Sequence, residues 1–464
     1  MDRVDAAGNF HDRSGLFAGR QRAEADPDLV LGTPEADAIR RLRESLTYTY
    51  DLNVSKDDGM HAEVKFPALG KEDHIWQAEP DAPYASRRAL ASAHGPYQSS
   101  LTPRIADVQL DLPAGMSADL AESEAALGQF DQYARLVLGA ENPAIGPMSS
   151  ILLRTESTSS SQIENLTVGA RQLALAEIGQ GRSENAGVVT ANVRAMEAAL
   201  RLADKLDEES ILAMHRELLS GQRGWEEHAG KYRDGLVWVG TSALTPRGAS
   251  HIAPQKEHVP GAMADLVAFM RRSDLPVIAQ AAIAHAQFET IHPFSDGNGR
   301  TGRALVHSLL RAKGVMRSTT APISAGLLRN TDAYFGALTS FREGDAGPII
   351  TSFTDASLFA ASSGTKLVDD LAGQVDEARE RLSGLRSDAA SWKVLPHLVE
   401  NPVVNAPLLI RKLGMNEVTA QRALEQLVSR GVLVERSGLQ RKRIYQHDGI
   451  LNVLDVYAQQ LHRR

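Results

Sequence analysis

The residues best suited to chemistry lie in one short stretch, His292-Pro293-Phe294-Ser295-Asp296-Gly297-Asn298-Gly299-Arg300. Apolar residues at helical spacing precede and follow it, which predicts a tight loop between two helices. Gly297 and Gly299 allow positive φ angles and leave no Cβ between backbone and ligand. Because the next helix is expected to begin near Arg300, backbone N–H groups and the positive end of the helix dipole converge there. The pattern predicts a phosphate-binding loop.

The side chains of this stretch complete a nucleotide site. Asp296 offers a hard oxygen ligand of the kind that Mg²⁺ takes beside phosphate oxygens. Arg300 and Arg303 are three residues apart, so they share a helix face and can each bind a phosphate group through two hydrogen bonds. His292 titrates near neutral pH, which suits a general base acting on a hydroxyl nucleophile. These residues predict transfer from a nucleotide to a hydroxyl, without indicating which phosphorus is attacked.

The stretch, continued by Thr301-Gly302-Arg303, resembles the signature His-Pro-Phe-x-Asp/Glu-Gly-Asn-Gly-Arg-x-x-Arg of the Fic (filamentation induced by cyclic AMP) family, and every fixed position is present. Most Fic proteins with this complete signature transfer AMP from ATP to a Ser, Thr or Tyr hydroxyl of a protein and release pyrophosphate. The resemblance implies the same activity here, with ATP as substrate and Mg²⁺ as cofactor.

The resemblance also implies a role for each residue of the signature. His292 would take the proton of the hydroxyl, and Asp296 would hold Mg²⁺ between the α- and β-phosphates. The nucleotide contacts would come from Asn298 and the backbone of Gly297 and Gly299 (α-phosphate), Arg300 (β-phosphate) and Arg303 (γ-phosphate).

A serine-rich segment upstream, Ser157 to Ser161, has the composition of a linker, but its apolar neighbours predict a helix with a buried side. Ser160-x-x-x-Glu164-Asn165 is similar to the inhibitory motif of the family, Ser/Thr-x-x-x-Glu-Gly/Asn. Ser160 and Glu164 are four residues apart and share a helix face. The resemblance implies that Glu164 pairs with Arg303 and excludes the γ-phosphate, because one guanidinium cannot bind both anions.

Two further pieces are similar to parts of the family's core. Apolar runs at 236–239 and 251–253 flank turn residues and predict a β-hairpin, which resembles the Fic flap that docks a target segment by strand pairing. Tyr334 and Leu338, four residues apart on a predicted helix, would cover the adenine. His215 is interpreted as a core or capping residue rather than a second catalytic histidine.

The pattern of the last 74 residues, 391–464, predicts a winged helix-turn-helix unit. Helices around 392–398 and 408–413 precede a third helix, which is capped by Asn416 and ended by Gly431, and two short strands follow. Basic residues lie on the expected wing, Arg436, Arg441, Lys442 and Arg443, with Arg422 on the third helix. This permits contact with DNA phosphates, but the same fold also serves protein docking or dimerisation, and DNA binding is not favoured.

The composition of the chain limits its possible ligands, its chemistry and its location. The 464 residues carry a net charge of -8, which argues against a general polyanion binder, and no cysteine, which removes disulfides and thiolate chemistry. No apolar run approaches the ~18 residues of a membrane span, and Met1 to Arg22 lacks the pattern of a secretory signal. We therefore expect a cytoplasmic protein without a membrane partner.

The predicted fold is mainly α: a Fic-type helical bundle with a β-hairpin flap, followed by the winged unit. The predicted divisions are 1–78 (role unknown), 79–205 (helical N-terminal region with the inhibitory helix), 206–365 (catalytic core), 366–390 (helical linker) and 391–464 (winged unit). The expected partner is a protein with a hydroxyl side chain, docked on the flap; self-modification and a homodimer are also consistent.

Two alternatives to AMP transfer remain at this point. The first is a Fic enzyme that removes AMP or transfers another nucleotide or phosphate-containing group. The second is a DNA-binding regulator that uses a Fic core as a sensor.

Overall fold

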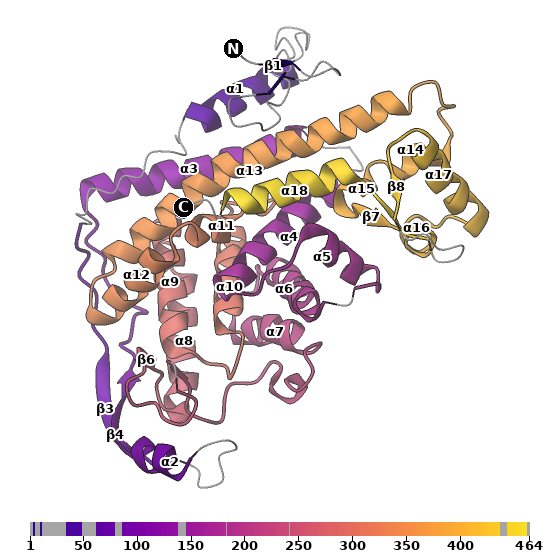
Figure 1. Cartoon of the computed structure of the whole chain (residues 1–464). Coiled ribbons are helices and arrows are strands. Elements are labelled where there is room, and N and C mark those ends of the chain that lie inside the picture. Colours follow the sequence, from indigo (N-terminus) through magenta and orange to yellow (C-terminus); the bar gives the residue numbers. More distant parts are fainter. Residues whose placement is uncertain are drawn as a thin grey trace.

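The computed structural model describes residues 3–4, 10–11, 34–48, 62–78, 86–137, 145–181, 183–240, 242–436 and 443–461. Within these residues the chain is mainly helical, and its strands form small antiparallel sheets (Figure 1). The mainly α fold class predicted from the sequence is confirmed.

The helices before the C-terminal unit are α1 (Pro34–Tyr48), α2 (Arg87–Ala93), α3 (Ala114–Val137), α4 (Ile145–Ile163), α5 (Ala170–Glu177), α6 (Glu184–Arg201), α7 (Glu208–Leu219), α8 (Val259–Arg271), α9 (Val277–Ile291), α10 (Asn298–Ala312), α11 (Ile323–Leu328), α12 (Thr331–Glu343) and α13 (Gly347–Arg381). The short 3₁₀ turns are Glu226–His228 and Lys256–His258. The strands are β1 (Arg3–Val4), β2 (Phe10–His11), β3 (Gly70–Trp76), β4 (Gly95–Leu101), β5 (Trp238–Val239) and β6 (His251–Ile252).

Helix α9 forms the centre of the molecule. Every residue from Ile278 to Ile291 is buried, which is the pattern of a helix surrounded by other elements rather than one with a solvent face. Alanine recurs along it, so neighbouring helices approach closely, and α3, α8, α10, α12 and α13 all pack against it. This packing fixes the end of α9, where the signature begins.

Helix α13 differs from the sequence prediction. The segment 366–390 was predicted to be a helical linker. It is helical as far as Arg381, but this helix begins at Gly347 inside the core and continues without a break. Leu367, Val368 and Leu371 are buried, and α13 lies along α3 (Figure 1). The charged residues that indicated a connector lie on the solvent side of a packed helix.

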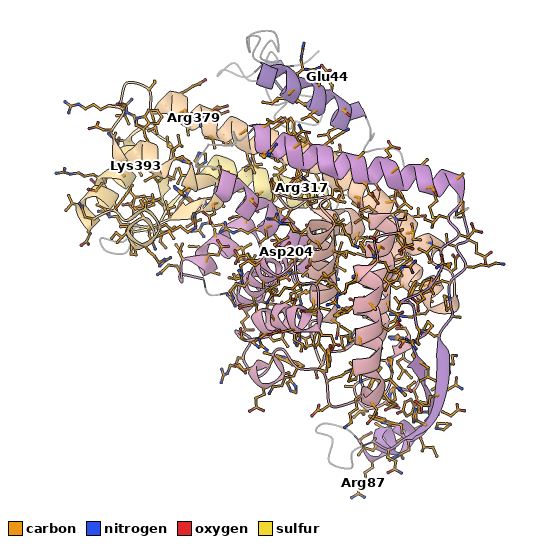
Figure 2. All side chains as sticks on the ribbon, turned by 180° about the vertical axis from the view of Figure 1, so that it is seen from behind. Glu44, Arg87, Asp204, Arg317, Arg379 and Lys393 are labelled. Carbon is orange, nitrogen blue, oxygen red and sulfur yellow. The ribbon has the colours of Figure 1, made fainter. Side chains whose placement is uncertain are left out.

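A hairpin precedes α3. Strand β3 pairs antiparallel with β4 over its whole length, from Gly70 opposite Leu101 to Trp76 opposite Gly95. It extends to one end of the molecule, and α2 with Arg87 lies at its tip (Figure 2). The predicted boundary at residue 78 therefore falls inside a hairpin. The Trp76 ring meets Trp238 of β5 at 5.3 Å between ring centroids, so the hairpin supports the short sheet of β5 and β6.

The C-terminal unit contains α14 (Ala390–Val394), α15 (His397–Glu400), β7 (Val403–Val404), α16 (Ala406–Leu413), α17 (Glu417–Ser429), β8 (Val434–Glu435), β9 (Tyr445–Gln446) and α18 (Asp448–Gln460). Asn416 caps α17 by accepting a hydrogen bond from Thr419 N, as expected. The strand order is β7-β9-β8, and both pairings are antiparallel. Helix α18, which the sequence did not predict, returns along α13.

The predicted wing is described only in part, because Arg441 and Lys442 lie outside the described residues. Arg436 forms an ion pair with Asp448 at 2.7 Å, which reduces its availability for a phosphate. The winged-helix assignment and DNA contact stay predictions.

Of the helices in the described ranges, none is both long and apolar enough to cross a membrane.

Candidate active site

The signature loop joins α9 to α10. His292 ends α9 in the left-handed region, with φ 49° and ψ 60°, and Gly297 caps α10 with φ 77°. The side-chain amide of Asn298 spans the loop: it accepts a hydrogen bond from Phe294 N and donates one to Phe294 O, both at 2.9 Å. Because these bonds hold the amide inside the loop, the backbone N–H of Asn298 is better placed than its side chain for the predicted phosphate contact.

The side chain of His215 packs against the loop and forms a hydrogen bond with it. Its ring stacks on Phe294 with centroids 3.6 Å apart. Gly230 N donates to Nδ1, so the proton is on Nε2, which donates to Asp296 O at 3.0 Å. Burial lowers the pKa of His215 to about 4, so the ring is neutral at pH 7. The interpretation of His215 as a core residue agrees with this geometry.

Arg233 joins the loop to the flap, a role that the sequence did not indicate. Its guanidinium donates to four backbone carbonyls: His292 O at 2.8 Å, Gly235 O at 2.8 Å, Pro254 O at 2.6 Å and, more weakly, Ile291 O at 3.4 Å. Burial lowers its pKa to about 10, with Glu257 acting in the opposite direction, so it is charged at pH 7. These bonds hold His292 in a backbone conformation that non-glycine residues rarely adopt.

We expect Arg233→Met to be strongly destabilising. Methionine removes the donors of all four carbonyls, and two of them, Pro254 O and Ile291 O, accept in buried surroundings, at about 1–3 kcal/mol for each buried group left unsatisfied. Chemical denaturation should show at least about 2 kcal/mol lower unfolding free energy. Lys231→Met, which removes a charge at an exposed position two residues away, is the matched control. Equal loss in both variants would contradict the anchoring role of Arg233.

Glu164 occupies the centre of the site. Its Oε1 lies 2.6 Å from Arg303 Nη2, and its Oε2 lies 2.9 Å from Arg300 Nε. The contact of Glu164 with Arg300 is an ion pair and not a hydrogen bond, because Arg300 Nε has no hydrogen-bond partner in the described residues. Ser160 also binds Arg303, with its Oγ accepting from Nε at 2.7 Å and its carbonyl from Nη2 at 2.8 Å. The predicted pair of Glu164 with Arg303 is therefore present, and Arg300 joins it.

The position of this carboxylate is that of a bound anion. A Cβ added to Gly299 would lie 2.5 Å from Glu164 Oε1, so the carboxylate rests directly on the first turn of α10. Helix N-termini bind anions at this place through unpaired N–H groups and the helix dipole. Burial alone would lower the pKa of Arg303, but the charge of Glu164 holds it above its ordinary value. Glu164 fills an anion site with a side chain of the same molecule.

Local structure explains the spacing of the inhibitory motif. Helix α4 ends at Ile163, and Asn165 adopts a left-handed conformation with φ 62°, which Asn tolerates better than most residues. The helix therefore ends before Leu166. Glu164 adds a negative charge at the negative end of α4, which is unfavourable by itself. The two arginines compensate for it.

A second contact joins α4 to α10, and the sequence analysis missed it. Glu156, fully buried, lies 2.8 Å from His307 Nε2, and its other oxygen accepts from Ser324 N at 2.9 Å. Glu156 precedes Ser160 by four residues, and His307 follows Arg303 by four. Continuing the same helix faces by one turn would have found both residues.

His292 has the geometry of a base. Its Nδ1 lies 3.3 Å from Glu289 O, and since a carbonyl can only accept, the proton is on Nδ1 and Nε2 carries the lone pair. Burial lowers the pKa of His292 to about 4, with the Glu289 carbonyl acting in the opposite direction. The ring is therefore neutral and able to accept a proton at pH 7.

Glu289 is a further titratable group behind His292. Its Oε2 lies 3.9 Å from His292 Nδ1, and its buried Oε1 has no hydrogen-bond partner in the described part of the chain. Burial raises the pKa of Glu289 to about 7, although Arg303 opposes this. A carboxylate at this place favours the imidazolium that forms when Nε2 takes a proton.

We therefore expect the pH dependence of a reaction catalysed by His292 to report Glu289. Ionised Glu289 favours proton uptake, so the rate should rise as pH increases through about 7, or slightly below when Glu164 is absent, because Glu164 raises this pKa. Glu289→Gln should remove this rise and lower the plateau on the order of tenfold, the equivalent of one pKa unit of basicity. An unchanged profile of rate against pH in Glu289→Gln would show that Glu289 does not act through His292.

Asp296 and Tyr334 interact with the arginines of this network, Asp296 with Arg300 and Tyr334 with Arg303. Asp296 Oδ2 accepts from Arg300 Nη2 at 3.0 Å and remains partly exposed at the mouth of the loop. Tyr334 is buried, at 2% exposure, and its hydroxyl bonds with His285 Nε2 at 2.6 Å. In this arrangement Tyr334 is a core residue, and its contact with adenine stays a prediction.

The flap is shorter than predicted. Strands β5 and β6 form two antiparallel pairs, Trp238 with Ile252 and Val239 with His251. Val239 is 45% exposed. His251 is buried and bonds with Thr290 O at 2.9 Å, which ties the flap to the end of α9, beside His292.

Two family models match this part of the chain. Residues 205–310 match the model of the Fic/DOC family, and residues 117–201 match that of the Fic/DOC family N-terminal region. These residues belong to the Fic/DOC family. The resemblance found in the signature is thereby confirmed for the region that contains both α4 and the loop.

Curated relatives of this Fic region include the protein adenylyltransferase fic-1 of Caenorhabditis briggsae, 32% identical over 167 residues. The protein adenylyltransferase Fic of Drosophila melanogaster is 29% identical over 194 residues. The matches cover 33% and 38% of this chain but only 30% and 35% of the relatives. The chain thus spans about a third of the length of these relatives. A crystal structure of a Fic family protein from Desulfovibrio desulfuricans is 22% identical, with a TM-score of 0.48, over 75% of this chain and 98% of the other.

Proposed function

We propose that this chain transfers AMP from ATP to a hydroxyl group of a protein, and that Glu164 inhibits the transfer. The observation that carries this proposal is the carboxylate of Glu164, held between Arg300 and Arg303 on the first turn of α10. Arg300, Arg303 and the first turn of α10 form a site for an anion. Any other anion that binds there must displace the Glu164 carboxylate. The names of the relatives, protein adenylyltransferases, support ATP as the source of that anion.

The residues divide the work of the reaction. The hydroxyl oxygen of the target attacks the α-phosphorus of ATP, and His292 Nε2 accepts the hydroxyl proton. The bond from the α-phosphorus to the bridging oxygen breaks, and pyrophosphate leaves with the electron pair. Arg300 and Arg303 stabilise the charge on the leaving group, and the backbone N–H groups at the start of α10 hold the α-phosphate.

Asp296 fits a magnesium ion. In the described residues no group of three acidic or histidine side chains is placed to hold a metal, and a Mg²⁺ that binds with nucleotide needs only one or two carboxylates beside phosphate oxygens and water. When bound, Mg²⁺ would neutralise phosphate charge. Asp296 would exchange Arg300 for the metal, which would free that arginine for the β-phosphate.

A target protein is expected to dock on the flap. The exposed Val239 strand offers an edge to an extended segment, and the hairpin β3–β4 supports the flap from the other side. Self-modification is consistent with the same geometry. A homodimer, DNA binding through the C-terminal unit, and removal of AMP or transfer of another group remain alternatives that no contact described here favours.

The test is intact-mass spectrometry of Glu164→Gly after incubation with Mg²⁺ and ATP, with and without cell extract as a source of targets. Parallel reactions use ATP labelled on the α- or on the γ-phosphate. Protein-bound label from the α-phosphate alone supports AMP transfer. Protein-bound label from the γ-phosphate would replace this proposal with phosphoryl transfer.

A further inference from the structure

A cavity of about 350 Å³ lies between α4, the start of α5 and α18. The α4 residues that line it are Ile151, Arg154, Thr155, Thr158, Ser159 and Gln162. Glu156, Ser160 and Glu164 lie on the opposite side of the same helix, because residues four apart share a face. A molecule in the cavity would therefore touch the helix whose other face binds Arg300 and Arg303.

The C-terminal unit closes the cavity. Leu454, Asp455 and Tyr457 of α18 form the wall opposite α4. Asp455 Oδ1 accepts a hydrogen bond from Ala170 N at 3.1 Å, and Tyr457 bonds with Ser363 of α13 at 3.1 Å. The site thus exists only while the C-terminal unit is docked on the Fic region.

The lining combines apolar walls with unused polar groups. Ile151, Leu173 and Leu454 supply apolar surface. Within the described residues, the side chains of Thr158, Ser159 and Gln162 make no hydrogen bond, so a ligand can use them. This mixture is typical of a site for a small organic molecule.

The charged side chains that line the cavity favour a ligand with a positive charge. Arg154 is balanced by Glu177, whose Oε1 lies 2.5 Å from its Nε. Asp455 receives one backbone N–H but has no basic side chain within 4.0 Å in the described part of the chain. The cavity therefore keeps one carboxylate without a counter-ion.

We propose that this cavity binds an organic amine with an apolar ring, its ammonium group at Asp455, and that the ligand strengthens inhibition by Glu164. The second half rests on the proposed AMP transfer. The ligand bridges α4 and α18 in the arrangement in which Glu164 holds both arginines, so it stabilises that state. Nucleotide requires Glu164 to leave, and the two ligands therefore oppose each other.

Binding is tested by calorimetry on the full chain with three indoles that differ in charge: tryptamine, tryptophol and indole-3-acetate. We expect tryptamine to bind at least about tenfold more tightly than tryptophol, and indole-3-acetate to bind more weakly still. Asp455→Asn, which keeps an acceptor for Ala170 N, should abolish this preference. Equal affinity for the three indoles, or no binding of any, would overturn the proposal.

Two matched variants locate the site. Ala458→Trp fills the cavity from α18 and should abolish binding, whereas Val456→Trp replaces a residue on the solvent side of the same helix and should not. Retained binding in Ala458→Trp would place the ligand elsewhere.

The coupling is tested by AMP incorporation. Ser160→Ala, which loses one contact to Arg303, serves as a partly released enzyme, and saturating tryptamine should slow it at least about fivefold. Glu164→Gly should be unaffected. Equal slowing of both would show that tryptamine acts at the active site. If tryptamine binds as expected but no variant transfers AMP, the proposed function fails while the cavity site stands.

Discussion

Replacing Glu164 by glycine is expected to raise the rate of AMP incorporation at least about tenfold and to tighten ATP binding by a similar factor. A tenfold change corresponds to about 1.4 kcal/mol, which is modest for the loss of a carboxylate that competes directly for two arginines. The helix dipole works in the same direction, because Glu164 lies at the unfavourable end of α4. Replacing Glu164 therefore removes an unfavourable charge at the end of α4 as well as a competitor of the nucleotide.

This prediction is checked by calorimetry with Mg²⁺ and ATP and by the initial rate of label incorporation. Ser160→Ala is the matched variant, since it removes one hydrogen bond to Arg303 and leaves the carboxylate in place. Its effect should be smaller in both measurements. If Glu164→Gly and the wild type bound ATP equally and reacted at equal rates, Glu164 would not be an inhibitor.

Replacing His292 in the Glu164→Gly background is expected to lower the rate by about 10²–10⁴-fold, the usual contribution of a general base. ATP affinity should stay within about threefold, because His292 acts on the hydroxyl rather than on the phosphates. His292→Ala is informative only if the loop survives, since His292 has a φ of 49°. His292→Asn tolerates that conformation better and provides the second variant.

The measurements are single-turnover rates and ATP dissociation constants of both double variants. Loss of rate with retained ATP binding supports the role of His292 as the base. A double variant that keeps the full rate would remove the histidine from the reaction, and joint loss of rate and binding would indicate a collapsed loop.

The signature could be interpreted from the sequence because its residues are contiguous and each residue type is suited to one chemical role. The same holds for Ser160 and Glu164, whose spacing of four residues places them on one helix face. The contact of Glu164 with Arg300 was not predicted, because it depends on the end of α4. That end is set by Asn165 in a left-handed conformation, and a pattern of apolar residues does not reveal it.

Arg233 and Glu289 show what sequence reasoning could not reach. Arg233 binds carbonyls of distant segments, and backbone carbonyls carry no sequence signal. Glu289 lies one turn before His292, but its importance depends on burial, which changes its pKa and places its carboxylate beside the ring. Both roles follow from packing around α9.

The largest difference in the fold concerns α13. Charged residues beyond position 366 indicated a connector, whereas the structure buries the apolar stripe of α13 against α3. The contact of Tyr334 with adenine was expected from the family resemblance together with its spacing from Leu338. The spacing is helical as predicted, and the contact stays a prediction, because helical spacing does not determine which face meets a ligand.

The most direct test of the account is a crystal structure of Glu164→Gly with Mg²⁺ and a non-hydrolysable ATP analogue. We expect the phosphates to lie on the first turn of α10, with the terminal phosphate between Arg300 and Arg303 where the Glu164 carboxylate lies in the wild type. Phosphates bound away from these two arginines would contradict the claim that Glu164 occupies the nucleotide's place.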